Sequence, residues 1–420
     1  MVFIKHTFKN TFLFFFLLFI SCRNNASSNF ATAKIDPQTV SKVNKTATSV
    51  SQPPVVGANQ LDAYLPLLKN KNVAFVGNQT SVIFRNDTKT THLVDSLVAH
   101  SIKIKKVFSP EHGFRGKADA AEHVADGRDK KTGIPIISLY GKNKKPTSDM
   151  LKDIDIIVFD IQDVGVRFYT YISTLHYVMQ SCAENQIPVI ILDRPNPNGH
   201  YIDGPVLDTR HSSFVGMHPV PLVHGMTIGE YAQMINGEGW LQTDQKCNLT
   251  IIPVKNYTHT TPYHLPIRPS PNLPNDIAIN LYPSLGLFEG TTINAGRGTE
   301  MQFQLIGAPE LPKDKYPFSY TPAPNFGAKN PKHKGNLCNG IDLRNTEKMN
   351  RINLSWIINA YKLSSKKAVF FKNKSFTIHA GNTLLQKQIE QGVSIQKIRD
   401  SWNSDLNIYK KTRAKYLLYK

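Results

Sequence analysis

Short apolar runs alternate repeatedly with longer amphipathic stretches over residues 60–255. The apolar runs have the length and the Val/Ile content of strands, and they are 73–76, 102–107, 134–139, 154–159, 188–192 and 249–254. Apolar residues recur at helical spacing in 88–100, 148–152, 168–185 and 227–241. This alternation predicts right-handed βαβ units, and therefore an α/β fold with a doubly wound, mainly parallel sheet.

The composition of the chain and its pattern of predicted elements change after about residue 255. Prolines become frequent over 262–283, and the later pattern predicts a helix near 347–363, a strand near 375–379 and helices from about 383 onward. We therefore predict a large domain over 57–255 and a smaller α+β domain over 256–420. No G-x-G-x-x-G motif opens a predicted helix, so no dinucleotide cofactor is expected.

The N-terminus has the pattern of an export signal over residues 1–21. Lys5 and Lys9 precede an apolar run, 11–20, that is too short to span a bilayer. Residues 19–22, Phe-Ile-Ser-Cys, loosely match a lipobox and predict lipid attachment at Cys22, with an ordinary secretory signal as the alternative. Residues 22–56 are rich in Asn, Ser and Thr and predict a flexible linker. We expect an exported membrane lipoprotein that faces the periplasm.

The net charge of +19 is concentrated near the C-terminus, where residues 361–420 hold 13 Lys and Arg against 3 Asp and Glu. Because an exported protein rarely meets nucleic acid, we expect no nucleic-acid partner. We interpret the excess as attraction to anionic envelope polymers or lipid surfaces, with a solvated helical face as the alternative. Cys182, Cys247 and Cys338 lack metal-ligand spacing, and at most one disulfide can form among these three.

An acid and an imidazole follow directly after one predicted strand. The strand over 102–107 leads into the segment S-P-E-H-G-F-R-G at 109–116. Pro110 ends the strand, and the glycines of the segment permit turn conformations. Ligands of open parallel sheets bind at the carboxyl ends of the strands. Glu111 and His112 are therefore candidate catalytic residues, although a solvated surface loop would have a similar composition.

Two further predicted strands end in polar clusters. The strands over 154–159 and 188–192 run into D-I-Q-D-V-G-V-R-F-Y at 160–169 and D-R-P-N at 193–196. In a parallel sheet these clusters share one edge with Glu111. The candidates from these two clusters are Asp160 and Asp163 for catalysis, and Gln162, Arg167, Tyr169, Arg194 and Asn196 for substrate binding. A strand-end Asp often caps a helix instead, which is the alternative for each Asp.

The remaining candidates come from later segments. They are His224, Asn272, Tyr282, Glu289, Arg297 and Glu300. Gly296 and Gly298 flank Arg297 and predict a tight loop that presents its guanidinium to a ligand carboxylate. An internal ion pair between Arg297 and Glu300 is the alternative.

The candidate set points to acid/base chemistry on a neutral, hydroxyl-rich substrate, because it has neither metal-ligand spacing nor a G-x-S-x-G motif. Glycoside hydrolysis needs an acid beside the leaving oxygen and a second group that activates water, attacks or orients the substrate. Glu111 is the predicted acid. Asp160, Asp163, Glu289 or the acetamido group of an N-acetylated sugar is the predicted second group.

Seven motifs, in order over residues 60–420, resemble those of the exo-β-N-acetylmuramidases of the NamZ type. They are S-P-E-H-G-F-R-G (109–116), D-I-Q-D-V-G-V-R-F-Y-T-Y (160–171), D-R-P-N-P-N-G (193–199), P-L-V-H-G-M-T-I-G-E (221–230), R-P-S-P-N-L-P (268–274), Y-P-S-L-G-L-F-E-G-T (282–291) and G-R-G-T-E (296–300). The resemblance implies a Rossmann-like domain joined to a smaller α/β domain, with the active site in the cleft between them.

The resemblance also implies an activity, the release of terminal N-acetylmuramic acid (MurNAc) from the non-reducing ends of peptidoglycan fragments such as MurNAc-β-1,4-GlcNAc, without a cofactor. Glu111 occupies the position of the family's catalytic glutamate. The lactyl carboxylate of this substrate would give Arg297, Arg167 or Arg194 a partner.

Two rival functions fit part of the sequence. A lipid-anchored sugar-binding protein would share the anchor, the linker and the α/β pattern, but the two halves of this chain are not matched lobes. A metal-dependent hydrolase of wall sugars, a deacetylase or phosphatase, would use Asp160, Asp163 and His112. Insensitivity to a chelator would argue against that second rival.

Overall fold

The protein is described from a computed structural model, which covers residues 52–85, 89–115 and 126–419. The predicted signal peptide, the lipobox with Cys22 and all but the end of the predicted linker lie outside the described residues. At that end, Val55 forms an isolated antiparallel bridge with Lys255, and Val56 is buried. No helix in the described part of the chain is long and apolar enough to cross a membrane.

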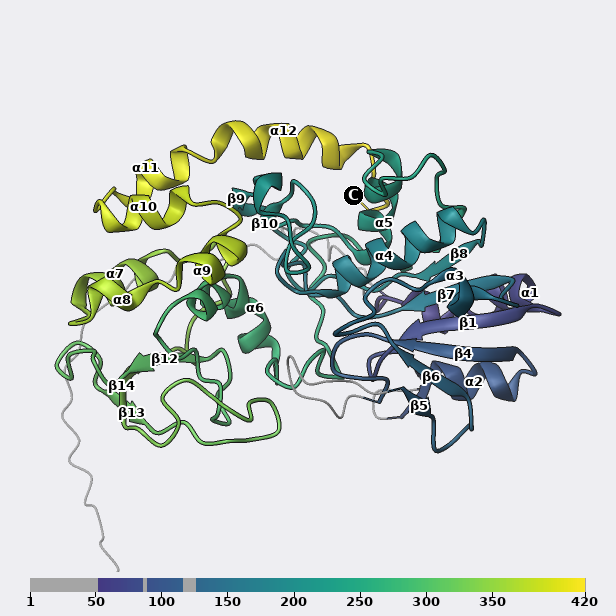
Figure 1. Cartoon of the computed structure of the whole chain (residues 1–420), viewed down its shortest axis with the longest axis horizontal. Coiled ribbons are helices and arrows are strands. Elements are labelled where there is room, and N and C mark those ends of the chain that lie inside the picture. The colour runs from purple at the N-terminus through teal and green to yellow at the C-terminus, as the bar shows by residue number, and fades with distance from the viewer. Residues whose placement is uncertain (1–51, 86–88, 116–125, 420) are drawn as a thin grey trace, which may run out of the picture. The chain divides into compact units, whose positions relative to one another are not determined.

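A seven-stranded sheet organises the N-terminal half of the chain (Figure 1). Its strand order is β11 (Leu249–Ile252), β8 (Val189–Leu192), β7 (Ile156–Asp160), β1 (Asn72–Gly77), β4 (Lys103–Ser109), β6 (Pro135–Ser138) and β5 (Gly127–Arg128). All neighbouring strands are parallel except β5 and β6. The six predicted strands are confirmed, and their order across the sheet is that of a Rossmann-like fold.

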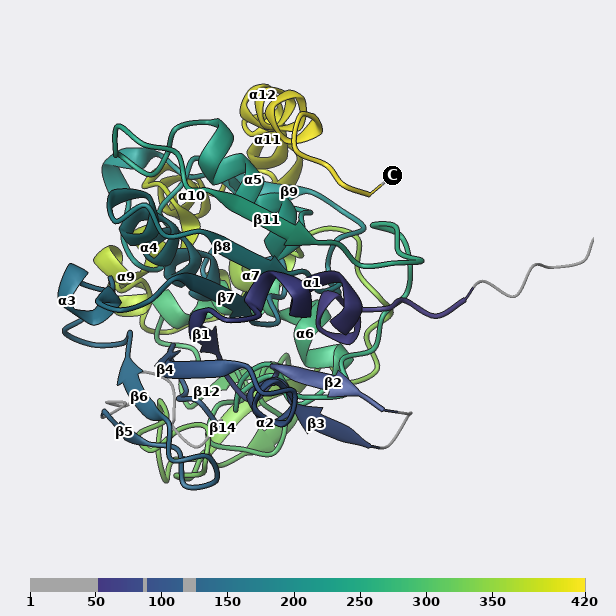
Figure 2. The same ribbon diagram turned by 90° about the vertical axis from the view of Figure 1, so that its right-hand side faces the viewer.

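Helices cover both faces of this sheet because successive side chains of each strand point to opposite faces. Ala74 and Val76 of β1 belong to the same core as α4 (Tyr171–Glu184) and α5 (Ile228–Gly237). Val73 and Phe75 belong to a second core, with α1 (Leu61–Leu68) and α2 (Leu93–Ala99). Figure 2 shows the two pairs of helices on different sides of the sheet. The predicted doubly wound architecture is therefore confirmed.

The other strands form three small antiparallel sheets. They are β2 (Val82–Phe84) with β3 (Thr90–His92), β9 (Asp203–Val206) with β10 (Pro221–Val223), and the order β12 (Leu305–Ala308), β14 (Cys338–Asp342), β13 (Phe318–Tyr320). The helix predicted over 88–100 differs at its start, because the β-branched pair Thr90 and Thr91 lies in the β2–β3 hairpin and the helix begins only at Leu93.

The C-terminal half is mainly helical apart from its small sheet. Its helices are α6 (Asp276–Leu285), α7 (Ser355–Leu363), α8 (Lys367–Phe370), α9 (Asn373–Ala380), α10 (Leu384–Glu390), α11 (Ile395–Asp400) and α12 (Asn403–Ala414), with the 3-10 turn η3 (Gly286–Gly290). Three short elements come earlier in the chain, and they are α3 (Ser148–Leu151) and the 3-10 turns η1 (Gly57–Asn59) and η2 (Thr209–His211). The strand predicted over 375–379 is wrong, because α9 occupies it. Phe376 and Ala380, one turn apart, are both buried, and Gly381 ends the helix at φ 84°.

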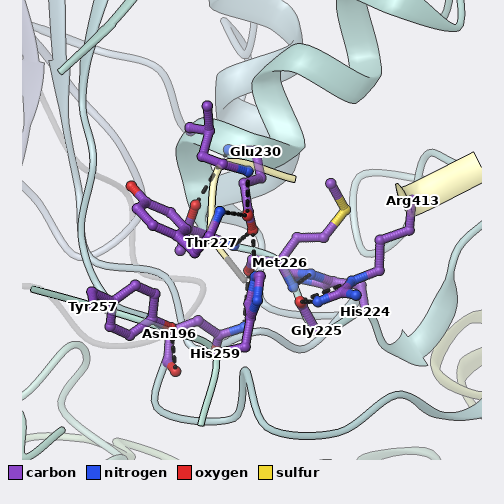
Figure 3. Close-up of polar contacts among 12 residues, drawn as sticks. Asn196, His224, Gly225, Met226, Thr227, Glu230, Tyr257, His259 and Arg413 are labelled. Atoms are coloured by element: carbon purple, nitrogen blue, oxygen red, sulfur yellow. Dashed lines mark hydrogen bonds and ion pairs between the residues drawn. The ribbon is translucent and has the colours of Figure 1, made fainter. Parts of the chain in front are cut away.

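The end of the described chain is held by two buried carboxylates, Glu230 in α5 and Asp193 directly after β8. The backbone N–H of Leu418 donates to the Glu230 carboxylate at 2.9 Å. His259 contacts the same side chain at 2.8 Å, and Figure 3 shows these two residues. The Tyr419 hydroxyl donates to the carboxylate of Asp193 at the end of β8. We call Leu418 and Tyr419, with Glu230 and Asp193, the C-terminal clasp.

The three cysteines of the described chain, Cys182, Cys247 and Cys338, are buried with free thiols. Burial raises the pKa of both Cys247 and Cys338 to about 12. Because the thiolate is the reactive form, thiols with such a pKa are poor nucleophiles. The cysteines therefore serve as small core residues.

Candidate active site

A cavity of about 230 Å³ lies at the carboxyl edge of the parallel sheet. The loop after β4 and the loop after β7 form part of its wall, and the second half of the chain forms the rest. Its lining consists of Glu111, His112, Phe168, Tyr169, Thr170, Tyr171, Val215, Ser270, Asn272, Leu273, Tyr282, Glu289, Arg297, Phe303 and His379. The predicted site residues that meet here are Glu111, His112, Tyr169, Asn272, Tyr282, Glu289 and Arg297.

Glu111 reaches the cavity because the chain turns sharply after β4. His112 and Gly113 adopt the left-handed conformation at φ 71° and 80°, and the backbone N–H of Gly113 donates to the carbonyl three residues earlier at 3.1 Å. The Glu111 Oε2 accepts a hydrogen bond from the Thr170 hydroxyl at 2.8 Å. Tyr140 is also hydrogen-bonded to Glu111, and burial together with this carboxylate raises the pKa of Tyr140. Two hydroxyl groups thus orient the Glu111 side chain.

The residues that follow the glutamate anchor this loop to the fold. Phe114 is buried, and Arg115 lies 2.7 Å from Asp129 and 3.0 Å from Asp95. Burial disfavours the charged form of Asp129, but the hydrogen bonds from Arg115 and Thr132, together with the positive charge of Arg115, outweigh burial and lower the pKa of Asp129 to about 2. The F-R of the S-P-E-H-G-F-R-G segment therefore positions the loop rather than contacting the cavity.

An ion pair contributed by the second half forms another part of the wall. The Arg297 Nη1 lies 3.2 Å from the Glu289 Oε2, and both side chains are about a quarter exposed, at 24% and 25%. Arg297 Nη2 and Asn272 Nδ2 both donate to the carbonyl of Gly327, at 3.2 and 2.6 Å. Although burial favours the neutral form, Arg297 and Lys332 hold the pKa of Glu289 below its usual range. The cavity therefore holds a fixed cation beside an ionised carboxylate.

Gly296 and Gly298 give the Arg297 loop its shape, as predicted. Their φ angles are 79° and 83°, which favour glycine. A Cβ at Gly296 would also lie 2.3 Å from the carbonyl oxygen of Met301. The loop backbone is therefore close-packed, which limits the positions open to the guanidinium.

Aromatic rings supply much of the remaining lining. Tyr282 meets Phe168 and Phe303 edge to face, with centroids 5.1 and 4.8 Å apart. The Tyr169 hydroxyl donates to the carbonyl of Pro269 at 2.8 Å. Burial raises the pKa of Tyr169 and of Tyr282, so both hydroxyls stay neutral. Such rings suit the apolar C–H faces of a sugar, while the ion pair suits a charged substituent.

Family models match both halves of the chain. Residues 73–277 match the N-terminal part of exo-beta-N-acetylmuramidase NamZ, and residues 280–419 match its C-terminal part. The chain belongs to the NamZ family. A peptidoglycan beta-N-acetylmuramidase NamZ of Bacillus subtilis (strain 168) is 41% identical to it over 378 residues, which cover 86% of this chain and 89% of that protein.

Two crystal structures from Bacteroides fragilis NCTC 9343, both of DUF1343 family proteins, are similar in fold. The first has a TM-score of 0.80 and 45% identity, and covers 88% of this chain and 99% of its own. The second has a TM-score of 0.72 and 28% identity, and covers 87% of this chain and 99% of its own. The Rossmann-like sheet and the smaller second part are thus shared with experimentally determined relatives.

Two of the predicted NamZ-motif residues lie in the core rather than at the cavity. Asp160 and Arg194 form an ion pair with Arg194 Nε 2.6 Å from Asp160 Oδ1, and their side chains are 0% and 2% exposed. Arg194 also donates to the carbonyl of Val82 at 3.0 Å. The pair joins the carboxyl ends of β7 and β8, so it fixes the strand ends from which the loops leave.

Arg167 is likewise a structural residue, because its guanidinium is fully buried and bonded to backbone carbonyls. Its Nη1 donates to Pro205 and Val220 at 2.7 and 2.8 Å, and its Nη2 to His379 and Ala380 at 3.1 and 2.8 Å. Arg167 thereby ties β9 and the segment before β10 to the end of α9, which carries the cavity residue His379. The Arg167 guanidinium thus binds these four carbonyls, and Arg167 is not part of the cavity lining.

The other predicted site residues also lie away from the cavity lining. Gln162 donates to the carbonyl of Pro195 at 2.7 Å, and Asn196 donates to that of Met226 at 2.9 Å (Figure 3). The remaining predicted residues are the buried Asp163, which accepts from the backbone N–H of Gly165 at 2.7 Å, the buried His224, with its Nε2 3.6 Å from Asp163 Oδ2, and the exposed Glu300. Gln162, Asn196 and Asp163 therefore bind backbone groups, and none of these five residues lines the cavity.

The residues that sequence reasoning missed at the site include Thr170, Tyr140 and His379. Thr170 lies in the motif at 160–171, and its hydroxyl beside a strand-end loop was a detectable signal. Tyr140 follows β6 and obeys the same strand-end rule as Glu111. His379 was hidden by the mistaken strand over 375–379. Among the described residues, no group of three His, Cys, Asp or Glu side chains could hold a metal ion.

Proposed function

We propose that this chain is an exo-acting glycosidase that releases MurNAc from the non-reducing end of peptidoglycan fragments such as MurNAc-β-1,4-GlcNAc, with Glu111 as the catalytic acid. The observation that carries this proposal is the position of Glu111 in the cavity lining, oriented by Thr170 and Tyr140. The name of the Bacillus subtilis relative supports the same substrate class. Such an activity serves turnover and recycling of the cell wall.

In this mechanism the protonated Glu111 donates its proton to the glycosidic oxygen while the bond from that oxygen to the anomeric carbon breaks. The leaving sugar departs as an alcohol, and the positive charge that develops on the MurNAc ring is quenched when water supplies a hydroxyl to the anomeric carbon. The deprotonated Glu111 regains a proton from that water. The hydroxyls of Thr170 and Tyr140 keep the carboxyl in place through both steps.

Among the protein side chains, Glu289 fits best as the second catalytic group. The acetamido group of the substrate is the other candidate for that role. Of the three predicted carboxylates, Glu289 lines the cavity, whereas Asp160 and Asp163 do not. Arg297 and Lys332 keep Glu289 ionised in spite of its burial. An ionised carboxylate in this cavity is suited to stabilise positive charge on the sugar ring or to activate water.

Arg297 is the proposed partner of the lactyl carboxylate. Of the three arginines considered from the sequence, Arg167 and Arg194 are committed to buried partners, and Arg297 lines the cavity. A guanidinium can bind a carboxylate through two hydrogen bonds. This contact would distinguish MurNAc from N-acetylglucosamine (GlcNAc), which lacks the lactyl group.

The activity is tested by incubating the protein with MurNAc-β-1,4-GlcNAc and identifying products by mass spectrometry. We expect free MurNAc and GlcNAc in equal amounts, and no cleavage of GlcNAc-β-1,4-GlcNAc, because only the first substrate carries the lactyl group. Cleavage that starts inside longer glycan strands, or no MurNAc from the disaccharide, would contradict the proposal.

We also propose that the chain is exported and anchored to the membrane through a lipid on Cys22, facing the periplasm. The N-terminal basic and apolar pattern and the lipobox-like segment support this location. In cell fractionation, the wild type should sediment with membranes, whereas a Cys22→Ser variant should lose most of its membrane-bound fraction. An unchanged membrane fraction for that variant would contradict lipid attachment at Cys22.

A further inference from the structure

A row of three aromatic side chains begins at the catalytic acid and leads away from the cavity. Tyr140 and Phe214 have ring centroids 6.3 Å apart, and Phe214 and Tyr177 lie 6.2 Å apart with their planes within 12° of parallel. All three rings are half-buried, so part of each is open to solvent. We call Tyr140, Phe214 and Tyr177 the aromatic row.

The aromatic row is continuous with the Glu111 cavity at two points. Tyr140 is hydrogen-bonded to Glu111 itself, and Val215, next to Phe214 in the chain, lines the cavity. At its far end, Tyr177 follows Thr170 by seven residues. That spacing is two helical turns, which places Tyr177 on the same face of α4 and about 10 Å further along the helix. The row therefore has a fixed direction, from the acid outward.

A second cavity, of about 490 Å³, opens along the row. Tyr177 and Phe214 line it together with Trp240, and hydroxyls come from Ser212 and Ser213. Lys144 Nζ lies 4.7 Å from the centroid of the Phe214 ring. Aromatic rings with hydroxyls nearby and an ammonium group over one ring match the chemistry of a sugar, which has an apolar C–H face and polar hydroxyl groups.

The size of the Glu111 cavity indicates where the rest of a saccharide must go. At about 230 Å³ it is smaller than pockets that enclose drug-sized ligands, which are about 300–1,000 Å³. It therefore suits one sugar ring rather than two. A general acid lies within hydrogen-bond reach of the oxygen that the leaving group keeps, so the leaving sugar must lie on the Glu111 side of the broken bond.

We propose that the aromatic row is the binding site for the leaving-group sugar, the GlcNAc that follows the terminal MurNAc. This inference rests on the proposed function, because it takes Glu111 as the acid and MurNAc as the occupant of the first cavity. Phe214 is the central residue of the site, since it touches both other rings and the Lys144 ammonium. With the aromatic row, the enzyme should prefer substrates whose leaving group is a sugar to substrates whose leaving group is an alkyl chain.

The test measures binding without turnover, in a Glu111→Gln background, by calorimetric titration with free MurNAc and with MurNAc-β-1,4-GlcNAc. Adding Phe214→Ala should weaken binding of the disaccharide about tenfold, because one aromatic contact is lost, and should leave binding of MurNAc within about twofold. Phe214→Trp should restore most of the disaccharide affinity. Phe318→Ala, which removes a half-buried ring from β13, is the matched control and should change neither affinity.

Equal weakening of both ligands by Phe214→Ala would overturn the proposal, because Phe214 would then support the MurNAc cavity. An unchanged disaccharide affinity would overturn it as well. Failure of the proposed function has a different signature, namely that the wild-type protein does not cleave the disaccharide. In that case, a selective loss of disaccharide affinity in the titrations would support the aromatic row as a site for the second sugar and would overturn its role in binding a leaving group.

Discussion

Glu111→Gln is expected to lower kcat/KM for MurNAc-β-1,4-GlcNAc by about 10³-fold, because glutamine has no proton to give to the leaving oxygen. The fold should remain intact, since glutamine has nearly the same shape as glutamate and its amide oxygen can still accept a hydrogen bond from the Thr170 hydroxyl. Initial rates measure the loss, and thermal unfolding of the variant checks its stability. A variant that kept more than a tenth of the wild-type rate would rule out Glu111 as the acid.

The leaving group provides an independent check on this role. A 4-nitrophenyl muramide has a leaving group that departs with little help from an acid, so Glu111→Gln should impair its hydrolysis far less than that of the disaccharide. A loss of equal size on both substrates would mean that Glu111 does something other than donate a proton. Glu184→Gln, at an exposed Glu184–Lys145 pair, is the matched control and should have little effect on either substrate.

Arg297→Ala is expected to weaken inhibition by free MurNAc about 10- to 100-fold, the usual worth of a hydrogen-bonded charge pair. Inhibition by GlcNAc should change much less, because GlcNAc has no lactyl carboxylate. The inhibition constants of the two sugars, measured in parallel, give the ratio that tests this contact. A parallel loss for both sugars would assign Arg297 to a general role in the cavity instead.

Two further variants separate charge from geometry at this position. Arg297→Lys keeps the cation but loses the fork of two donors, so it should recover part of the preference for MurNAc. Glu289→Gln removes the carboxylate that competes for the guanidinium, 3.2 Å away, and should preserve or increase that preference. A preference for MurNAc abolished by Glu289→Gln would contradict the direct contact with Arg297.

The sequence pattern was sufficient for the sheet but not for every element. Buried parallel strands read as apolar runs, and all six such runs became strands of one sheet. The short antiparallel strands were missed because their pairing depends on partners outside the local pattern. The segment 375–379 alternates like a strand, yet burial of Phe376 and Ala380 on one helical face decides its structure. Tertiary contacts with other parts of the chain therefore determine that this segment is a helix and not a strand.

The expectation that ligands bind at the carboxyl ends of parallel strands located the site. It does not determine which residues at the strand ends face the ligand. Glu111 turns into the cavity because two left-handed residues follow it, whereas Asp160 turns to Arg194, which lies just beyond the end of the neighbouring strand β8. Asp193 binds the start of α5, because it accepts from the backbone N–H of Gly229 in the first turn, while Thr227 is the N-cap of that helix. Each outcome depends on a partner that is remote in sequence, so these roles required the structure.

The C-terminal clasp bears on how long the folded molecule lasts. The Tyr419 hydroxyl donates a hydrogen bond to Asp193, which lies 226 residues earlier in the chain. The same hydroxyl accepts a hydrogen bond from the backbone N–H of Val254, 165 residues earlier. A contact that closes so long a loop gains its energy only after the rest of the fold has formed, so it comes late in folding. Its energy then adds to the barrier against unfolding and leaves the folding rate nearly unchanged. For an enzyme that works outside the cytoplasm, as proposed here, that barrier sets the working lifetime.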